Sequence, residues 1–419
     1  MNNSPPAASA YYGLALLSFV SFFNYLDRMV LAVLVEPIKR DLNLSDLQIG
    51  LVSGLAFALL YATAGIPIAR IADKKSRVTL LSICLAVWSG MTALTGTARN
   101  FTELFLARMG VGVGEAGCIP AAHSLIGDLF PPERRAFAIG IFQAGGLLGM
   151  SVGLTAAGYL AETWGWRFAL LVVGLAGLPL AALIAFTMRE PARSVSASNT
   201  AGESAMVAVR ALMARPTLVH LVLGISIGAF ATYGMASWIP AFYIRSHGLS
   251  LTEVGFYGAL AGGLAGVLGT VIGGLLMIRL RPRDARWELW LPLFGYALTM
   301  PLFAAMYLVP SVLVAFLFQA AATILAAAGG TVALSAIQTF AEPHRRATAI
   351  AIMLMVSSLI GLGLGPVAVG QASNMLAVIA GGESLRFALA GSSALLLWAG
   401  LHFWLAARHA VRDAATVAK

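Results

Sequence analysis

Twelve long apolar stretches recur along the chain, and they limit its fold more than any other feature. A helix needs roughly 20 apolar residues to cross a bilayer, and a backbone in hydrocarbon must satisfy its own hydrogen bonds. Hydrophobic residues make up 59% of the sequence and charged residues 11%, whereas soluble domains carry about 25% charged residues. We therefore expect an all-α, membrane-embedded protein. The expected spans are 12–36, 47–69, 78–98, 102–127, 137–160, 166–188, 217–244, 254–278, 288–309, 311–338, 347–371 and 385–407.

The net charge of +9 does not indicate a nucleic-acid partner, because the distribution of the basic residues fits the expected membrane topology. If the N-terminus is cytoplasmic, most Lys and Arg residues fall in loops on that side, which is the positive-inside bias of membrane proteins. We therefore expect both termini in the cytoplasm. The basic residues assigned to that side are Arg70, Lys74, Lys75, Arg77, Arg134, Arg135, Arg189, Arg193, Arg210, Arg215, Arg279, Arg281, Arg283, Arg286, Arg345, Arg346, Arg408, Arg412 and Lys419.

The two halves of the chain are related to each other. Residues 130–139, which follow the fourth span, match residues 340–350 after the tenth span, with one residue inserted. Repeats in the same orientation predict two six-helix bundles with a substrate site between them and alternating access. The expected domains are residues 1–193, a cytoplasmic linker with a short amphipathic helix at 194–214, and residues 215–419. We expect a monomer.

Arg108 and Glu115 place two charges inside the fourth span, among Gly110, Gly112, Gly114 and Gly117. Their separation of seven residues is about two helical turns, so both side chains lie on one face. Charges within a membrane are costly and normally face a bundle interior or a water-filled cavity. We therefore expect Arg108 and Glu115 to share one cavity.

Asp27 and Arg28 bring charge into the first span, within the sequence Asn24-Tyr25-Leu26-Asp27-Arg28. Counted from the helix ends, the depth of Asp27 falls between the depths of Arg108 and Glu115. The second half of the chain contributes no ionised side chain to its membrane interior. A charged wall opposite an apolar, aromatic wall suits an amphiphile with an anionic head, although structural hydrogen bonding is the alternative for each polar residue. The further cavity candidates are Asn24, Tyr25, Gln143, Tyr233, Ser237, Trp238 and Gln319.

The loop at 70–77 is either a basic solvated turn or a latch. In the second interpretation Asp73 pairs with a facing Arg or with a helix N-terminus when the cytoplasmic side is closed.

Three other signals are rejected. Residues 112–117 fit the string G-x-G-x-x-G, but a dinucleotide site needs a preceding strand and a soluble βαβ unit. The His residues show no metal-ligand spacing, and no nucleophile other than Cys118 stands near Asp27 or Glu115. We expect no enzyme activity, no metal and no cofactor.

The pattern of twelve spans, the loop at 69–77 and Arg108-x-x-x-Gly112 resemble the major facilitator superfamily. The segments 24–28, 108–116 and 128–130 resemble more narrowly the spinster family, whose eukaryotic members transport sphingolipids and lysophospholipids, including sphingosine-1-phosphate. Because long eukaryotic loops and tails are lacking, the chain resembles a bacterial inner-membrane homologue. Two departures stand out: Ala69 and Ser76 replace glycines of the loop motif, and Met150 replaces the proline of the antiporter motif.

The resemblance implies that Asp27 and Glu115 couple transport to protons and that Arg108, with Arg28, holds the substrate head-group. It also implies a cytoplasmic gate. The residues assigned to that gate are Asp73, Lys74, Arg77, Asp128, Arg134 and Arg135.

We therefore expect a secondary active transporter that moves an anionic amphiphile, such as a lysophospholipid or a sphingoid phosphate, with protons as the coupling ion. The alternatives are a transporter of a small organic anion such as a sugar phosphate or carboxylate, a uniporter, a ligand sensor and a scramblase. The charged residues could also form static ion pairs that only hold the bundle together.

Overall fold

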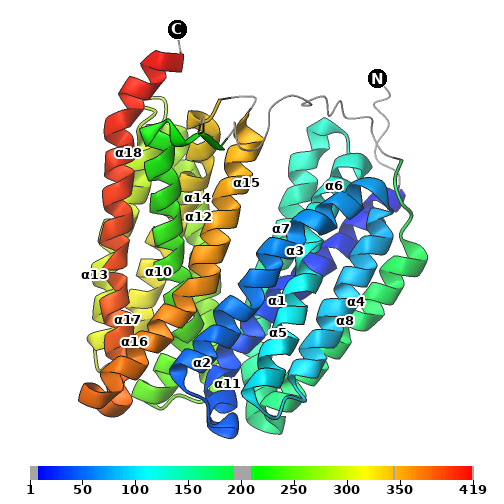
Figure 1. Cartoon of the computed structure of the whole chain (residues 1–419), viewed down its shortest axis with the longest axis vertical. Helices are drawn as coiled ribbons and strands as arrows, with labels where there is room; N and C mark the ends of the chain where they lie inside the picture. Colours follow the sequence, from blue (N-terminus) through cyan, green and yellow to red (C-terminus); the bar gives the residue numbers. More distant parts are fainter. Residues whose placement is uncertain (1–7, 193–208, 211, 343–344, 418–419) are drawn as a thin grey trace. The chain divides into compact units, whose positions relative to one another are not determined.

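The computed structural model describes residues 8–192, 209–210, 212–342 and 345–417, and every regular element in this part of the chain is a helix (Figure 1). The prediction of an all-α membrane protein is confirmed. Within the described residues, 11 segments are long and apolar enough to cross a membrane. The last of them, Thr348–Ala410, has 63 residues and contains the short 3₁₀ turn η5 (Gly381–Glu383). This segment therefore accommodates both of the last two expected spans.

Two compact units divide the chain, and we describe each by itself. Unit 1 comprises Met1–Ala197 and Leu249–Ala259, and unit 2 comprises Ser198–Gly248 and Leu260–Lys419. Most of the expected linker at 194–214 lies outside the described residues. The helices of unit 1 are α1 (Ala8–Leu42), α2 (Asp46–Gly50), η1 (Leu51–Leu55), α3 (Ala56–Lys74), α4 (Arg77–Thr95), α5 (Phe101–Ala116), α6 (Cys118–Leu129), α7 (Pro132–Trp164), α8 (Trp166–Thr187) and α11 (Leu251–Gly258).

In unit 2 the described residues 209–210 and 212–213 are helical, and the long helix α10 (Pro216–His247) follows them (Figure 1). The further helices of unit 2 are η2 (Ala259–Leu264), which starts at the unit boundary, α12 (Ala265–Leu280), α13 (Trp287–Leu308), α14 (Val312–Phe340), α15 (Arg346–Ser357), η4 (Ser358–Leu364), α16 (Gly365–Ala380), α17 (Ser384–Ser393) and α18 (Leu395–Val417).

Five expected spans are not single α-helices, and one of them, the twelfth, is interrupted at Ala394, between α17 and α18. The second, eighth and eleventh contain the π-helical turns η1, η2 and η4, a form that is rare and often found at functional sites. The fourth is interrupted at Gly117, between α5 and α6. A Cβ atom at Gly117 would lie 2.6 Å from the Ile68 side chain and 2.7 Å from the sulfur of Cys84, so this position requires glycine for close packing.

The α11 helix comes from the second half of the sequence but packs on α7 in unit 1. A Cβ atom at Gly158 would overlap the carbonyl oxygen of Leu251, and one at Gly255 would overlap the carbonyl oxygen of Leu154. The backbone N–H of Thr252 also donates to the Glu162 carboxylate at 2.8 Å. Paired glycines therefore allow two backbones to touch, as small residues commonly do between membrane helices.

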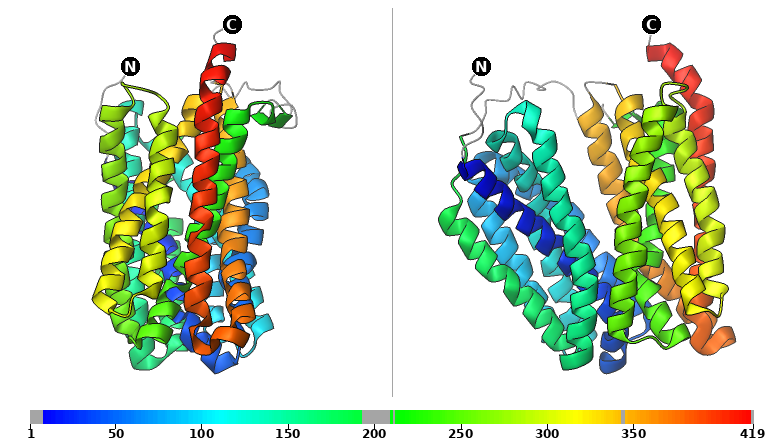
Figure 2. Two further views of the ribbon diagram at one scale, coloured as in Figure 1. Left: turned by 90° about the vertical axis from the view of Figure 1, so that its left-hand side faces the viewer. Right: turned by 180° about the vertical axis from the view of Figure 1, so that it is seen from behind.

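Glycines on α7 fix the position of α1, the helix that carries Asp27 and Arg28. These two helices run along each other through unit 1 (Figure 2, right). A Cβ atom at Gly149 would overlap the carbonyl oxygen of Phe22, and one at Gly153 would lie 2.9 Å from the Cα of Leu26. The glycine stripe therefore holds the α1 backbone in place from Phe22 to Leu26, the residue directly before Asp27.

We expect Gly149→Ala to lower the free energy of unfolding by about 1–3 kcal/mol, the usual range for overpacking a close contact. Gly140 is the matched control on the same helix, because a Cβ atom there meets nothing within 4 Å. The measurement is the thermal unfolding midpoint of each purified variant in detergent. Equal midpoints for Gly149→Ala and Gly140→Ala would show that the α1–α7 contact is looser than described.

Candidate functional site

The α5 helix buries both of the charged residues that the sequence placed within its span. It begins after Asn100, whose side chain accepts from the Glu103 N–H, and it ends at Ala116. Arg108 is 3% exposed and Glu115 is 0% exposed. An isolated charge in such an interior would be strongly disfavoured, so each of these residues needs a partner of opposite charge.

Glu115 pairs with Arg28 of α1. The Nε of Arg28 donates to Oε2 of Glu115 at 2.7 Å. The side chain of Arg28 remains 20% exposed, so this ion pair joins a fully buried carboxylate to an arginine side chain that is partly exposed.

Arg108 faces Asp27, the residue before Arg28 on α1. The Nη1 of Arg108 lies 3.5 Å from Oδ2 of Asp27, close enough for an ion pair but without the geometry of a hydrogen bond. The hydroxyl of Thr92, on α4, donates to the other carboxylate oxygen of Asp27. Three helices therefore meet at one buried carboxylate.

Glycines of α5 bring the neighbouring helices close to these pairs. A Cβ atom at Gly112 would overlap the carbonyl oxygen of Phe57 on α3, and one at Gly114 would lie 2.6 Å from the backbone nitrogen of Trp88 on α4. The α3 and α4 backbones therefore pack directly on the turn of α5 between Arg108 and Glu115.

Aromatic rings surround the Arg28 guanidinium. Its central carbon lies 5.0 Å from the ring centroid of Phe57, 5.1 Å from that of Tyr61 and 5.8 Å from that of Tyr25. Such cation–π contacts stabilise a cation by about 0.5–2 kcal/mol. The Phe57 and Tyr61 rings also stack on each other, with centroids 5.2 Å apart.

Several polar atoms of this cluster are buried without a hydrogen-bond partner among the described residues. They are Nε and Nη1 of Arg108, Nη2 of Arg28, Oδ2 of Asp27, Oε1 of Glu115 and both amide atoms of Asn24. An unmade hydrogen bond in a buried site costs about 1–3 kcal/mol. The cluster therefore has donors and acceptors available for a ligand with both kinds of group.

The other cavity candidates are dispersed. Gln143 is exposed on α7, and the remaining four lie in unit 2. Tyr233 is 47% exposed, while the hydroxyl of Ser237 donates to the Tyr233 carbonyl at 3.0 Å. The fully buried Trp238 donates to the Pro366 carbonyl at 3.0 Å. Gln319 accepts from the Tyr243 hydroxyl at 2.9 Å.

Arg77 is the centre of a second charged cluster in unit 1. Its guanidinium forms ion pairs with Asp128 and, at 2.8 Å, with Glu190, and it donates to the Ser124 hydroxyl at 3.0 Å. Glu190 also accepts from the Val78 N–H at 2.9 Å and from the Ser76 hydroxyl at 2.7 Å. Burial alone would raise the pKa of Glu190, but these hydrogen bonds outweigh it and lower the pKa below its ordinary value.

The remaining residues assigned to the gate contact other groups. Arg134 donates to the Tyr11 hydroxyl at 3.0 Å, and Arg135 donates to the Phe130 carbonyl at 3.1 Å. Lys74 is exposed, and the side chain of Asp73 lies outside the described part of the chain.

Sequence reasoning missed Thr92, Phe57, Tyr61 and Glu190. The first three are ordinary residues of apolar spans and carry no signal of their own. Glu190 could have been found, since it is an acidic residue directly after the sixth span in the sequence Met188-Arg189-Glu190-Pro191.

These features define a class of protein: a multi-pass helical membrane protein with charged residues held inside its first bundle. The family model of the Major Facilitator Superfamily matches residues 17–411. In the solved bacterial homologue of the human lysosomal transporter Spinster, in an inward-facing and unoccupied conformation, 99% of the chain aligns with 98% of this one, at 32% identity and a TM-score of 0.88.

Curated relatives agree with this match. An "MFS-type efflux pump" of Mycolicibacterium smegmatis is 34% identical over 96% of this chain and 94% of its own length. Human "Protein spinster homolog 1" is 27% identical over 86% of this chain and 72% of its own. A "Probable L-galactonate transporter" of Escherichia coli is 27% identical over 62% of this chain and 59% of its own. The chain belongs to the Major Facilitator Superfamily and, within it, to the spinster family of membrane transporters.

We expect Arg28→Gln to destabilise the protein by about 3–5 kcal/mol, because it leaves Glu115 buried without its partner, so that the carboxyl group either stays charged or must take up a proton. The double variant Arg28→Gln/Glu115→Gln removes both charges and should recover most of this loss. Thermal unfolding in detergent provides the comparison.

Asp41→Asn is the control for this experiment, because the Asp41–Arg167 pair is 45% and 41% exposed and exposed pairs are worth about 0.2–1 kcal/mol. If Arg28→Gln costs no more than Asp41→Asn, the Arg28–Glu115 pair is solvated and the description of a buried site is wrong.

Proposed function

We propose that this protein is a proton-coupled transporter of an anionic amphiphile, working by alternating access. Arg108 and Arg28 hold the anionic head-group, and Asp27 and Glu115 carry the coupling protons. The observation that carries this proposal is the set of unpartnered guanidinium and amide donors around two buried ion pairs.

The head-group chemistry follows from the donors. A guanidinium stays charged and forks onto phosphate or carboxylate, and charge-assisted hydrogen bonds are about twice as strong as neutral ones. The 3.5 Å contact between Arg108 and Asp27 is the weaker of the two pairs. An anion that offers two oxygens to Arg108 therefore competes well with Asp27.

Coupling follows from the same competition. When an anion takes a guanidinium away from its carboxylate, that carboxylate is left charged in an interior that disfavours unpaired charge. It then binds a proton, and it releases the proton when the guanidinium returns. Anion and proton therefore bind together, which makes symport the expected mode.

The rings of Tyr25, Phe57 and Tyr61 support the choice of an amphiphile, because they give the Arg28 side of the site an apolar surface. The spinster resemblance favours lysophospholipids or sphingoid phosphates as substrates. We propose a bacterial inner membrane as the location, with both termini in the cytoplasm.

In liposomes containing the purified protein, we expect Glu115→Gln to abolish the stimulation of flux by a pH gradient, while saturable exchange without a gradient persists. The substrate is radiolabelled lysophosphatidylglycerol, which albumin extracts from the outer leaflet. Its phosphodiester carries one charge that does not change near neutral pH, so that only protein groups supply protons.

Glu103→Gln is the matched control, since Glu103 is an exposed carboxylate on the same helix. It should keep the gradient response of the unchanged protein. If Glu115→Gln responds to the gradient as Glu103→Gln does, Glu115 has no part in coupling and the ion pair with Arg28 is structural. Flux that neither saturates nor is competed would instead indicate a scramblase.

A small organic anion is the second candidate, favoured by the E. coli relative named as an L-galactonate transporter. The two guanidinium groups and Asn24 also suit a sugar acid, which offers a carboxylate and hydroxyls. Competition decides between the candidates: excess galactonate should leave lysophosphatidylglycerol flux unchanged if the amphiphile is the substrate.

A further inference from the structure

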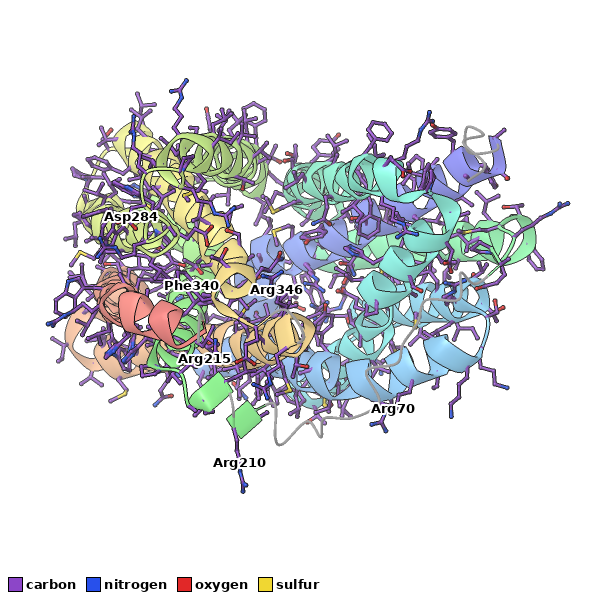
Figure 3. The ribbon with its side chains drawn as sticks, turned by 90° about the horizontal axis from the view of Figure 1, so that it is seen from above. Arg70, Arg210, Arg215, Asp284, Phe340 and Arg346 are labelled. Atoms are coloured by element: carbon purple, nitrogen blue, oxygen red, sulfur yellow. The ribbon has the colours of Figure 1, made fainter. Side chains whose placement is uncertain are left out.

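A pocket at one end of unit 2 has no part in the proposed transport site. It is lined by Met277, Arg281, Glu288, Ser335, Gln338, Thr339 and Arg346. Its volume of about 390 Å³ falls within the range of roughly 300–1,000 Å³ typical of ligand pockets. Figure 3 shows Asp284 in the turn after α12, Phe340 at the end of α14 and Arg346 at the start of α15, all at this end of the unit.

Glu288 is a buried carboxylate that is only half satisfied. It is 3% exposed, and its Oε1 pairs with Nε of Arg281 at 2.7 Å. Its other oxygen, Oε2, is buried with no hydrogen-bond partner among the described residues. This oxygen can accept a hydrogen bond from a ligand, for example from a hydroxyl group.

Arg346 supplies a cation on another wall of the pocket. It is exposed, and its guanidinium has no ion pair within the described chain, because nearby Glu342 is taken by Arg215 and Arg345. Arg346 is also the first residue of α15, where the helix macrodipole opposes a positive charge unless an anion is near. Thr339 and Gln338 also line the pocket and add a hydroxyl and an amide group to it.

The charge balance selects a ligand with one negative charge. Two guanidinium groups, those of Arg281 and Arg346, face the single carboxylate of Glu288, which leaves one positive charge in the pocket. A phosphodiester carries one negative charge, and a glycerol group attached to it carries hydroxyl donors for Glu288. The phosphoglycerol head-group of phosphatidylglycerol has both features.

The position of the pocket at the ends of membrane spans favours a membrane lipid over a free anion as its ligand. Its residues lie at the ends of spans that finish at Leu280 and Phe340. The first turn of α13, which carries Glu288, also carries Trp287 and Trp290, and Trp marks the level of lipid head-groups. Ile278 of α12, next in sequence to the lining residue Met277, is 71% exposed and offers an apolar contact for an acyl chain.

We propose that this pocket binds phosphatidylglycerol from the surrounding bilayer, with the phosphate on Arg346 and the glycerol hydroxyls on Glu288. The lipid is a resident ligand of unit 2 and not the transported substrate. Basic pockets between membrane helices are known to bind anionic head-groups.

Native mass spectrometry of the full chain in detergent tests this proposal with added diacyl phosphatidylglycerol, phosphatidylcholine and phosphatidylmethanol. We expect phosphatidylglycerol to bind more tightly than both, because phosphatidylmethanol keeps the charge but lacks the hydroxyls that Glu288 would accept from. Arg346→Gln should weaken phosphatidylglycerol binding about tenfold, the loss of one charge-assisted hydrogen bond.

Arg283→Gln is the matched control, since Arg283 is exposed in the adjacent turn and does not line the pocket. It should keep the preference, as should Glu115→Gln, which separates this site from the proposed transport site. Equal binding of the three lipids to the unchanged protein would overturn the proposal whether or not Arg346→Gln folds. Binding of free glycerophosphoglycerol as tightly as the lipid would overturn it too, in favour of a soluble anion.

Discussion

Unpaired charge is strongly disfavoured in a membrane interior, and unit 1 is organised around four charged side chains that meet this constraint in pairs. Arg28 with Glu115 and Arg108 with Asp27 are opposite-charge contacts between α1 and α5. These contacts exist only because glycines let backbones touch. Gly149 and Gly153 set α1 on α7, and Gly112 and Gly114 set α3 and α4 on α5. In this bundle, the close packing of the helices is therefore what brings the opposite charges together.

Much of this could be predicted from the sequence. The period of the helix placed Arg108 and Glu115 on one face, and the structure buries both. The pairing itself could not be predicted, because depth counted from helix ends says nothing of rotation about the helix axis. That rotation puts Arg28, and not Arg108, within 2.7 Å of Glu115. The roles of these residues in coupling remain predictions.

The irregular parts of the helices were beyond sequence reasoning for another reason. The π-helical turns η1, η2 and η4 lie within uniformly apolar stretches. In such stretches, hydropathy does not distinguish a π-helical turn from an α-helical one. The ends of the bundles were also harder to predict than their centres. Arg77 pairs with Glu190, which lies more than a hundred residues away in the sequence. One oxygen of Glu288, at the end of unit 2, has no hydrogen-bond partner in the part of the chain that the structure describes.

The linkage between anion binding and proton binding is the central claim. It is measured most directly by titration calorimetry of the purified protein with lysophosphatidylglycerol in buffers of different ionisation enthalpy. The account predicts that binding takes up about one proton, as one carboxylate loses its guanidinium. This uptake should disappear in Glu115→Gln or Asp27→Asn, because in either variant the two guanidinium groups balance the remaining carboxylate and the bound anion, and it should persist in Arg346→Gln. Binding heats that do not depend on the buffer would contradict the account, since the anion would then bind without displacing either ion pair.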